Sequence, residues 1–392
     1  MARVRILHGF TFFSSLGGVE SMLQRHHKVD ELWGIDSTFC AYFEPRTTEI
    51  PRVKGLGLSG LSCIHTARKR FRSCMTTTVD VMVYHNLWGL AFFADLDHAS
   101  RRMGVLHTDV PGLGAWLRHV RGMLDGILCA SEPLLDMVRR ELPELGGDRL
   151  AWLPYPVALS RTEANQEPIG KRPFVLGFAG RLSFEQKRVD RFPELVRALD
   201  MHHVHFRFEF LGDGPQSDWL KKQLGNDPRV RFHGRLSGSA YWEVLRGWDG
   251  IVFVSDYEGL PISLLEAMAV GVLPIVPGVG SGADAYVRNV RRDLLYPPGD
   301  VQAAAVVIKN LANSSAPEIQ GLRQRANKLA EPHLGDCYER AFSDQLLKVV
   351  AMPRISVSSF SRVIPCPRML VPFGILRRFW LDALWEPVFR RA

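Results

Sequence analysis

Short apolar runs rich in β-branched residues alternate along this chain with segments in which apolar positions recur every three or four residues. The runs predict β-strands, and the periodic segments predict helices. In the first half we expect strands at 4–9, 79–84, 104–107 and 126–130, and helices at 17–26, 90–102 and 131–142. In the second half we expect strands at 174–179, 206–212 and 250–254, and helices at 188–199, 216–224 and 262–269. Regular alternation of strand and helix predicts parallel sheets covered by helices, an α/β architecture.

A change of composition in the middle of the chain predicts a domain boundary. The sequence Leu-Pro-Tyr-Pro-Val at 153–157 is followed by a polar stretch at 160–172, which is typical of a linker. A length of 392 residues suits two domains. We therefore expect an N-terminal domain at 1–160, a second domain at 161–350 and a C-terminal tail at 351–392.

The overall composition is that of a globular protein. Apolar residues make up 46% and charged residues 23%, which excludes collagen-like, coiled-coil and disordered chains. The formal charge of +8 is the one feature that suggests nucleic acid, and because no base-reading motif accompanies it, we expect no nucleic acid partner. His8 and Thr11 interrupt the N-terminal apolar run, which favours a first strand over a signal peptide, and no run reaches the ~20 apolar residues of a membrane span. The six cysteines lack metal-ligand or disulfide spacing, which indicates reduced thiols in a cytoplasmic protein.

Most of the positive charge lies in the tail. Residues 351–392 hold seven arginines against Asp382 and Glu386, a net of +5, so the first 350 residues carry only +3. Aromatic residues alternate with these arginines, at Phe373, Phe379, Trp380, Trp385 and Phe389. Such a segment suits peripheral contact with the anionic inner face of the cell membrane, and it also suits packing against the first domain. A second basic run at 68–72 favours the membrane, and the sequence leaves both readings open.

The predicted strand ends of the second half carry candidate chemistry, because ligands of open parallel sheets bind at the carboxyl ends of strands. Gly180 and Arg181 follow the first of these strands, and Lys187 comes six residues after the arginine. Arginine and lysine together suit a diphosphate, although a solvated pair at a helix start gives the same pattern. After the next strand, Leu-Gly-Asp-Gly-Pro at 211–215 predicts a tight turn that allows close backbone approach.

Two glutamates flank a predicted helix start in the same half. Pro261 is well placed to open a helix, whose positive end and exposed backbone amides form an anion site. Glu258 precedes this helix, and Glu266 lies about one and a half turns inside it. Carboxylates beside an anion site suit hydroxyl pairs, as on a ribose and a hexose. The alternative is a helix with an acidic first turn and one unrelated glutamate.

In order and spacing, these motifs resemble the retaining GT-B glycosyltransferases of the "glycosyl transferases group 1" type, whose two glutamates are separated by seven residues. Asp249 before the Val-Phe-Val-Ser strand and Leu-Tyr-Pro-Pro-Gly-Asp at 295–300 match as well. The resemblance spans residues 4–310 and implies the GT-B architecture, two Rossmann-like doubly wound domains facing across a cleft. It also implies that Arg181 and Lys187 neutralise the diphosphate of a nucleotide-sugar donor and that Glu266 holds the ribose. Glu258 would orient hydroxyls of the donor sugar, and the backbone around the donor would come from Gly180, Gly259, Leu260, Pro261 and Ile262.

The resemblance extends to the first half of the chain. Gly17 and Gly18 look like the family's glycine loop near the diphosphate, and His107 matches the position that meets the donor sugar near the reacting carbon. His85 ends a neighbouring strand, and for this residue a functional role and ordinary hydrogen bonding stay equally open. The sequence from Asp95 to Asp97 spells D-x-D, a metal signature of another glycosyltransferase architecture. It falls within a helical pattern, so we expect solvated surface there and no metal.

The sequence departs from the family pattern in three places: Arg188 replaces the glycine that commonly follows the lysine, Asp284 stands where a glutamate is usual and could substitute for it, and Arg-Arg-Asp at 291–293 replaces a later Asn-Gly turn. The implied reaction moves a sugar, with retention and without metal or other cofactor, from a nucleotide-diphosphate donor to a hydroxyl of a glycan or lipid-linked acceptor. We expect a place in cell-surface polysaccharide or glycolipid synthesis. The alternatives are a nucleotide-sugar epimerase of the same fold, whose additional acid/base groups are not identified here, and a non-catalytic interaction protein, against which the intact site residues argue.

Overall fold

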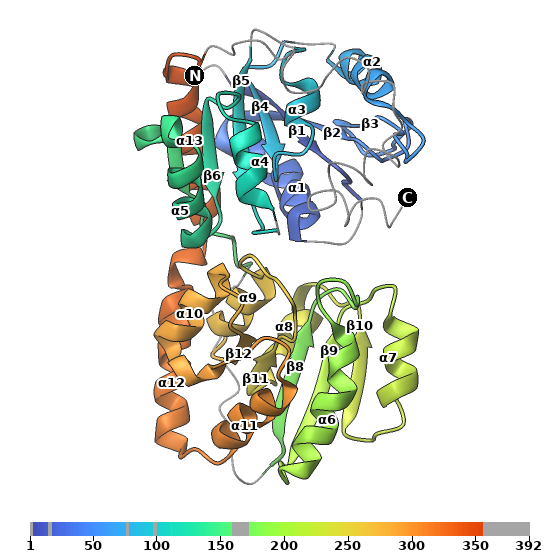
Figure 1. Cartoon of the computed structure of the whole chain (residues 1–392), viewed down its shortest axis with the longest axis vertical. Coiled ribbons are helices and arrows are strands. Elements are labelled where there is room, and N and C mark those ends of the chain that lie inside the picture. Colours follow the sequence, from blue (N-terminus) through green and yellow to red (C-terminus); the bar gives the residue numbers. More distant parts are fainter. Residues whose placement is uncertain are drawn as a thin grey trace. The chain divides into compact units, whose positions relative to one another are not determined.

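A computed structural model describes residues 3–14, 18–75, 78–96, 100–110, 112–158 and 172–355 (Figure 1). The chain divides into two compact units. The first unit contains the described residues up to Pro154 and those from Tyr338 onward, and the second spans Tyr155–Cys337. Each unit is built around one parallel sheet, as the alternation of strands and helices predicts.

The first unit holds a seven-stranded parallel sheet in the order β3-β2-β1-β4-β5-β6-β7. Its strands are β1 (Val4–Phe10), β2 (Ile35–Ala41), β3 (Val53–Gly55), β4 (Val81–His85), β5 (Arg101–Leu106), β6 (Gly126–Cys129) and β7 (Leu150–Trp152). Its α-helices are α1 (Gly18–Val29), α2 (Ile64–Cys74), α3 (Leu90–Phe93), α4 (Leu113–His119), α5 (Glu132–Glu141) and α13 (Cys337–Ala351). The central strand β4 is completely buried, which is why its first four residues form a continuous apolar run in the sequence.

The second unit holds a six-stranded parallel sheet in the order β10-β9-β8-β11-β12-β13. Its strands are β8 (Phe174–Ala179), β9 (Phe206–Leu211), β10 (Val230–Gly234), β11 (Gly250–Val252), β12 (Leu273–Pro277) and β13 (Leu295–Tyr296). Its α-helices are α6 (Phe192–Met201), α7 (Ser217–Leu224), α8 (Gly238–Arg246), α9 (Ile262–Ala269), α10 (Gly282–Val290), α11 (Val301–Ala312) and α12 (Ala316–Ala330). Phenylalanine rings fill the space between α6 and the sheet, where Phe192 meets Phe178 and Phe210 edge to face at 5.1 and 5.0 Å.

The predicted helix at 90–102 is wrong. Helix α3 covers only Leu90–Phe93, and Arg101 and Arg102 already belong to β5. Just past the helix end, Arg68 of α2 donates to the Phe92 carbonyl at 2.6 Å and forms a two-pronged ion pair with Asp95 at 2.6 and 2.7 Å. These bonds satisfy a carbonyl that another helical turn would otherwise have used. Asp95 therefore lies in a turn and is paired with an arginine, while Asp97 lies outside the described residues.

The chain returns to the first unit earlier than the sequence indicates. Residues 338–350 were expected in the second domain, but α13 packs in the first unit, where Glu339 accepts from Arg25 of α1 at 2.5 Å. The chain beyond α13 lies along the amino-terminal edge of the first sheet: Arg101 donates to the Met352 carbonyl at 2.9 Å and Arg149 to the Pro353 carbonyl at 2.7 Å. The first residues of the predicted tail thus pack on the first unit, and 356–392 lie outside the described residues.

Three aspartates make the same two hydrogen bonds to an adjacent strand at the amino-terminal ends of the two sheets. Asp80, Asp125 and Asp249 directly precede β4, β6 and β11. Each donates its backbone N–H to the carbonyl of the second residue of the adjacent strand, at 2.7–2.8 Å. Each carboxylate also accepts the N–H of that same residue, at 2.9 Å. The adjacent residues are Arg5, Arg102 and Val175. The repeated arrangement pairs backbone groups that would otherwise lack partners at the start of a strand.

None of the described helices is both long and apolar enough to cross a membrane. The five cysteines in the described part of the chain carry free thiols.

Candidate functional site

The carboxyl end of β8 is joined to the Leu-Gly-Asp-Gly-Pro turn by backbone contacts. Gly180 donates to the Leu211 carbonyl and Leu182 to the Asp213 carbonyl, both at 3.0 Å. Gly212 has a φ of +130°, and a Cβ placed there would lie 1.9 Å from the carbonyl oxygen of Gly180. The close backbone approach predicted for this turn is confirmed. It fixes the path of the chain that presents Arg181.

Arg181 is a half-buried cation beside this turn. Within the described part of the chain, no hydrogen bond or ion pair engages its guanidinium. A guanidinium offers five donors in a planar fork. The side chain can therefore bind an anionic ligand without first breaking a contact in the protein.

Lys187 and Glu258 form an ion pair at the same end of the sheet. Lys187 Nζ lies 2.7 Å from Glu258 Oε1, and their side chains are only 16% and 3% exposed. Ser255 donates to the same oxygen at 2.5 Å, and Gln186 donates to Oε2 at 3.3 Å. Three donors thus hold the Glu258 carboxylate in one orientation. An ammonium group has three N–H donors, so Lys187 can bind an anion while it stays paired with Glu258.

The start of α9 lies next to the end of β8. Ser263, in the first turn of α9, donates to the Ala179 carbonyl at 2.9 Å. Pro261 precedes the helix in an extended conformation, and the amides of Leu264 and Leu265 already bond to its carbonyl. The amides of the loop Gly259–Ile262 therefore stand at the positive end of the helix, a few residues from Glu258.

Glu266 projects from α9 toward α8. Tyr241 Oη of α8 donates to Glu266 Oε2 at 2.5 Å. Burial raises the pKa of Glu266, and the bond from Tyr241 partly offsets this effect. The hydroxyl bonds to one of the two carboxylate oxygens. Tyr241 had not been predicted, because nothing in the sequence links α8 to the glutamate motif.

Arg188 adopts the left-handed backbone conformation, with φ 48° and ψ 46°. Glycine takes this conformation without steric cost, which explains the usual glycine at this position. Here the arginine side chain is held by Asp190 and Asp256, with Nη–Oδ distances of 2.8 Å to each. The departure from the family pattern therefore preserves the backbone path after Lys187.

Asp249 and Asp284, two acidic residues considered with the family motifs, have structural roles. Asp249 is fully buried at the amino-terminal edge of the sheet and pairs with Arg172 and Arg323, each at 2.6 Å. Asp284 closes the capping box of α10, accepting from the amides of Gly280 and Ser281 at 3.0 Å. These bonds give Asp284 a structural role at the start of α10.

Histidines gather at the carboxyl end of the first sheet. His107 follows β5 and His85 ends β4, and His107 Nε2 lies 2.8 Å from His85 Nδ1. Both rings are buried, and burial lowers the pKa of His107 to about 3. Asn86 Oδ1 accepts from the His107 amide at 2.7 Å. Gly18 opens α1 in the same unit, and Gly17 lies outside the described residues.

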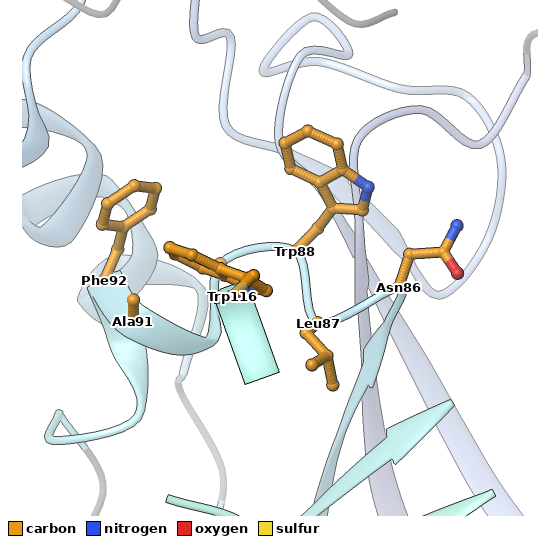
Figure 2. Close-up of a pocket in the computed structure, with 7 residues that line it drawn as sticks. Asn86, Leu87, Trp88, Ala91, Phe92 and Trp116 are labelled. Carbon is orange, nitrogen blue, oxygen red and sulfur yellow. The ribbon is translucent and has the colours of Figure 1, made fainter. Parts of the chain in front are cut away.

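An aromatic pocket adjoins these histidines in the first unit. The hollow is small, with a volume of about 10 Å³, and is lined by Asn86, Leu87, Trp88, Gly89, Ala91, Phe92 and Trp116 (Figure 2). Asn86 and Leu87 both take left-handed backbone angles, φ 48° and 58°, where β4 turns into the pocket wall. Strained non-glycine residues of this kind concentrate at functional sites. Asn86 links the pocket to His107, so the two features form one region.

The architecture defines the class of the protein as a GT-B fold. The apo form of the lipopolysaccharide outer core galactosyltransferase WaaB superposes with a TM-score of 0.65 at 17% identity, covering 88% of this chain and 99% of that one. The pneumococcal O-GlcNAc transferase GtfA, in complex with UDP and GlcNAc, superposes with a TM-score of 0.69 at 11% identity, covering 90% and 100%. At these identities the likeness establishes the fold.

The sequence relationship lies in the second half of the chain. Residues 173–314 match the family model described as "Glycosyl transferases group 1". The lipopolysaccharide 1,6-galactosyltransferase of Salmonella typhimurium is 34% identical over 145 residues, 34% of this chain and 38% of the relative. The 2-deoxystreptamine glucosyltransferase of Streptomyces kanamyceticus is 30% identical over 160 residues, 40% and 41% of the two chains. The matches thus cover about two fifths of these relatives. The part matched by the family model carries Arg181, Lys187, Glu258 and Glu266.

Proposed function

We propose that this protein is a retaining glycosyltransferase that moves a sugar from a nucleotide-diphosphate donor to a hydroxyl of a glycan or lipid-linked acceptor. The observation that carries the proposal is the grouping of Arg181, the Lys187–Glu258 pair and the amides before α9 at one end of the second sheet. This grouping lies inside the segment that matches the group 1 family. It combines anion donors with a carboxylate already fixed for hydroxyl recognition.

In this proposal the donor diphosphate binds Arg181 and the remaining donors of Lys187. The amides at the start of α9 add further positive potential. Glu266, held by Tyr241, accepts from the ribose diol, and Glu258 accepts from hydroxyls of the donor sugar. The two cations do the work that a divalent ion does in other architectures, so we propose that no metal is required.

The chemical step follows from where charge develops. The acceptor oxygen attacks the anomeric carbon on the face that the diphosphate leaves, and its proton passes to the departing phosphate oxygen. Negative charge grows on that diphosphate in the transition state, where Arg181 and Lys187 stabilise it more strongly than in the bound donor. These two side chains should therefore affect turnover as well as binding.

We propose that the acceptor binds in the first unit, against the partly exposed rings of Trp88 and Trp116 beside this small hollow. Aromatic faces suit the apolar face of a sugar ring, and the pocket adjoins His107. Relatives named for lipopolysaccharide and colanic acid synthesis support a cell-surface glycan or glycolipid as the product. We place the reaction in the cytoplasm, with peripheral contact between the tail and anionic membrane. Loss of binding to anionic vesicles on deletion of residues 369–392 would support this contact, and unchanged binding would assign the tail to packing.

The function is tested in two stages. Thermal-shift measurements with a panel of nucleotide sugars identify the donor as the one that raises the melting temperature. The protein and that donor are then incubated with candidate acceptors, with and without a chelator, and the products are analysed by mass spectrometry and by NMR of the anomeric centre. A retained linkage formed in the presence of chelator is the expected result. Conversion of the donor sugar without an acceptor would identify an epimerase, and no shift with any nucleotide sugar would indicate a non-catalytic protein.

A further inference from the structure

Two cysteines from separate elements meet in the first unit: Cys40 of β2 and Cys74, the last residue of α2. The buried side chains of α2, Ile64, Ala67 and Phe71, pack in the same core cluster as Cys40, and Cys74 continues this stripe by one turn. The two cysteine side chains share a hydrogen bond. Cys40 is 1% exposed, whereas Cys74 is half-buried. The pair therefore has one thiol in the core and one that solvent can reach.

Lys54 of β3 lies beside this pair. In the parallel register of β2 and β3, Lys54 is opposite Cys40, so the two side chains point to the same face of the sheet. Lys54 Nζ donates to the Cys74 carbonyl at 3.3 Å, which places an ammonium group at the end of α2. Arg46 acts on Cys74 as a second cation. Positive charge beside a thiol favours its thiolate form.

The hydrogen bond and these charges give the two thiols opposite properties. The bond from Cys40, with Lys54 and Arg46, lowers the pKa of Cys74 to about 7 against the opposing effect of burial. Burial raises the pKa of Cys40 well above its usual value. Cys40 therefore keeps its proton and donates it to the Cys74 sulfur. At neutral pH a large share of Cys74 is thiolate, the nucleophilic form of cysteine.

We propose that Cys74 and Cys40 form an oxidation site, at which a hydroperoxide converts the two thiols into a disulfide between α2 and β2. The Cys74 thiolate attacks one oxygen of the peroxide and the O–O bond breaks. Cys74 becomes a sulfenic acid, and the hydroxide that leaves takes up a solvent proton. The Cys40 sulfur then attacks the Cys74 sulfur, the S–O bond breaks, and the Cys40 proton leaves with that hydroxide as water. With hydrogen peroxide, two thiols and one peroxide give one disulfide and two waters.

This inference does not rest on the proposed function, because neither cysteine belongs to the candidate site. Disulfides of cytoplasmic proteins are usually transient and serve catalysis or redox sensing. Cys40 and Cys74 are free thiols in the structure, so the reduced protein is the starting state of the reaction. The disulfide would close the segment that contains β3 and α2 into a loop and restrain its unfolding.

Cys63 provides a matched control on the same helix. It precedes α2, at the opposite end from Cys74. Burial alone would raise the pKa of Cys63, but hydrogen bonds at the start of the helix lower it. A helix of 11 residues is about 16 Å long, well beyond the span of a disulfide. Cys63 is thus a reactive thiol that cannot pair with Cys74 while α2 is folded.

The test is mass spectrometry of the reduced full-length protein after treatment with hydrogen peroxide at neutral pH. Trypsin cleaves after Arg46, Lys54 and Arg72, so Cys40, Cys63 and Cys74 fall in separate peptides. We expect one dominant linked pair, which joins the peptides of Cys40 and Cys74 and separates again in dithiothreitol. In urea this preference should disappear, because it depends on the fold. Absence of this linked pair in the folded protein, or an equal yield of other cysteine pairs, would overturn the proposal.

Variants separate the two chemical steps. C40S removes the second thiol, so the Cys74 sulfenic acid should accumulate and be trapped by dimedone, whereas the wild type should be labelled little. C40A replaces C40S if the serine variant does not fold. C74S should leave the Cys40 thiol reduced, and C63S should form the disulfide as the wild type does. Equal dimedone labelling of Cys74 in the wild type and in a folded C40S or C40A protein would overturn the proposal.

The pH profile of alkylation identifies the nucleophile. The rate at which iodoacetamide modifies Cys74 should rise with a midpoint near pH 7. In K54M the midpoint should move to higher pH, whereas K69M, which removes an exposed lysine of α2, should leave it unchanged. A wild-type midpoint at the ordinary value of about 8.5 would overturn the assignment of Cys74 as the nucleophile. Equal profiles of K54M and the wild type would contradict its activation by Lys54.

Discussion

Arg181 and Lys187 are both assigned to the donor diphosphate, but the structure predicts that removing them has different effects on stability. No hydrogen bond or ion pair within the described residues engages the Arg181 guanidinium, so R181A breaks no polar contact among them. Its free energy of unfolding should stay within about 0.5 kcal/mol of wild type. Turnover should fall about 10²- to 10³-fold, the usual effect of deleting one donor that stabilises developing charge.

Lys187 should affect both properties. K187A leaves Glu258, 3% exposed, with only the neutral donors of Ser255 and Gln186. Removing one partner of a buried ion pair costs several kcal/mol, and the two remaining hydrogen bonds moderate that cost to about 2–3 kcal/mol. For a unit of this size, we expect the melting temperature to fall by roughly 5–10 °C. The loss of turnover should equal or exceed that of R181A.

The measurements are urea unfolding without ligand and steady-state kinetics with the identified donor. R181K and K187M serve as controls: the first keeps the charge but loses the planar fork, and the second keeps most of the side-chain volume. K187M should be as unstable as K187A, because both leave Glu258 unpaired. Near-normal turnover in R181A would refute the diphosphate assignment. Equal stability of R181A and K187A would refute the argument from the ion pair.

Three further changes test other parts of the structure. R188G should leave the free energy of unfolding, measured in urea, within about 1 kcal/mol of wild type. Glycine relieves the left-handed backbone strain of ~1–2 kcal/mol, and this gain offsets the loss of two half-exposed ion pairs. A loss of stability above about 2 kcal/mol would contradict this balance. Y241F should weaken donor binding about 10-fold in calorimetry. The variant removes the only described side-chain hydrogen bond of Glu266, and the pKa of Glu266 should then rise further. Unchanged affinity would exclude Glu266 as a donor ligand. Burial lowers the pKa of His8 to about 4 in the folded protein, whereas in the unfolded chain this histidine gains a proton below about pH 6.5. Stability should therefore fall as the pH decreases below about 6.5, by about 3 kcal/mol for this side chain. Urea titrations between pH 7 and 4.5 measure this slope, and a fold that gains stability on acidification would contradict it.

The second-half site could be predicted because its residues lie close together in the sequence and are separated by glycine and proline. Strand β8 and helix α9 begin and end where the apolar pattern places them. Arg181, Lys187 and Glu258 each follow a buried strand, so the parallel topology brings them to one edge. Sequence could not show that Lys187 and Glu258 contact each other. That pairing depends on the backbone conformation of Arg188 and on the hydrogen bonds of Ser255 and Gln186.

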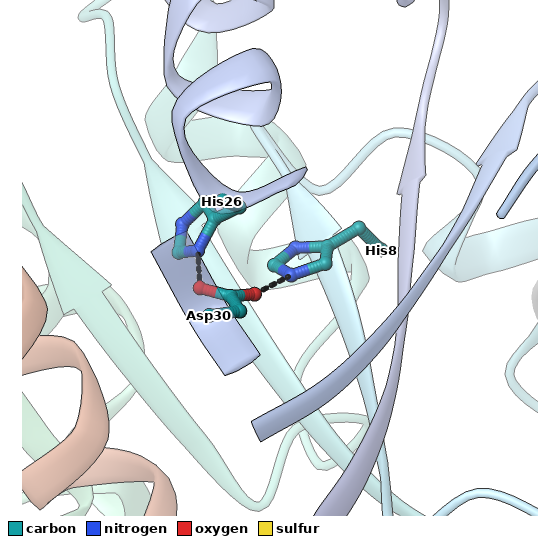
Figure 3. Close-up of side chains that lie close together, drawn as sticks. All are labelled: His8, His26 and Asp30. Atoms are coloured by element: carbon teal, nitrogen blue, oxygen red, sulfur yellow. Dashed lines mark hydrogen bonds and ion pairs between the residues drawn. The ribbon is translucent and has the colours of Figure 1, made fainter. Parts of the chain in front are cut away.

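The contacts among the buried histidines of the first unit could not be predicted, because these residues come from separate elements. His8 and His85 lie on the adjacent strands β1 and β4, and His107 follows β5. His26 and Tyr338, which share a hydrogen bond, are 312 residues apart in the chain. Two local signals do exist. A histidine in the apolar run of β1 is unusual for a buried strand, and His26 and Asp30 are four residues apart at the end of α1 (Figure 3). Neither signal identifies its partners without the fold.

The repeated aspartate arrangement explains why Asp249, which matches the family pattern, lies away from the candidate site. Asp249 precedes β11 as Asp80 precedes β4 and Asp125 precedes β6, and all three close the amino-terminal edge of a sheet with the same pair of backbone hydrogen bonds. Because ligands of these folds bind at the opposite edge, an aspartate directly before a strand indicates structure, whereas a charged residue directly after one indicates function. By this criterion Asp249 differs from Arg181 and Glu258, although all three match the family pattern. Asp249 stabilises the start of a strand, whereas Arg181 and Glu258 follow strands, at the edge where ligands bind in these folds.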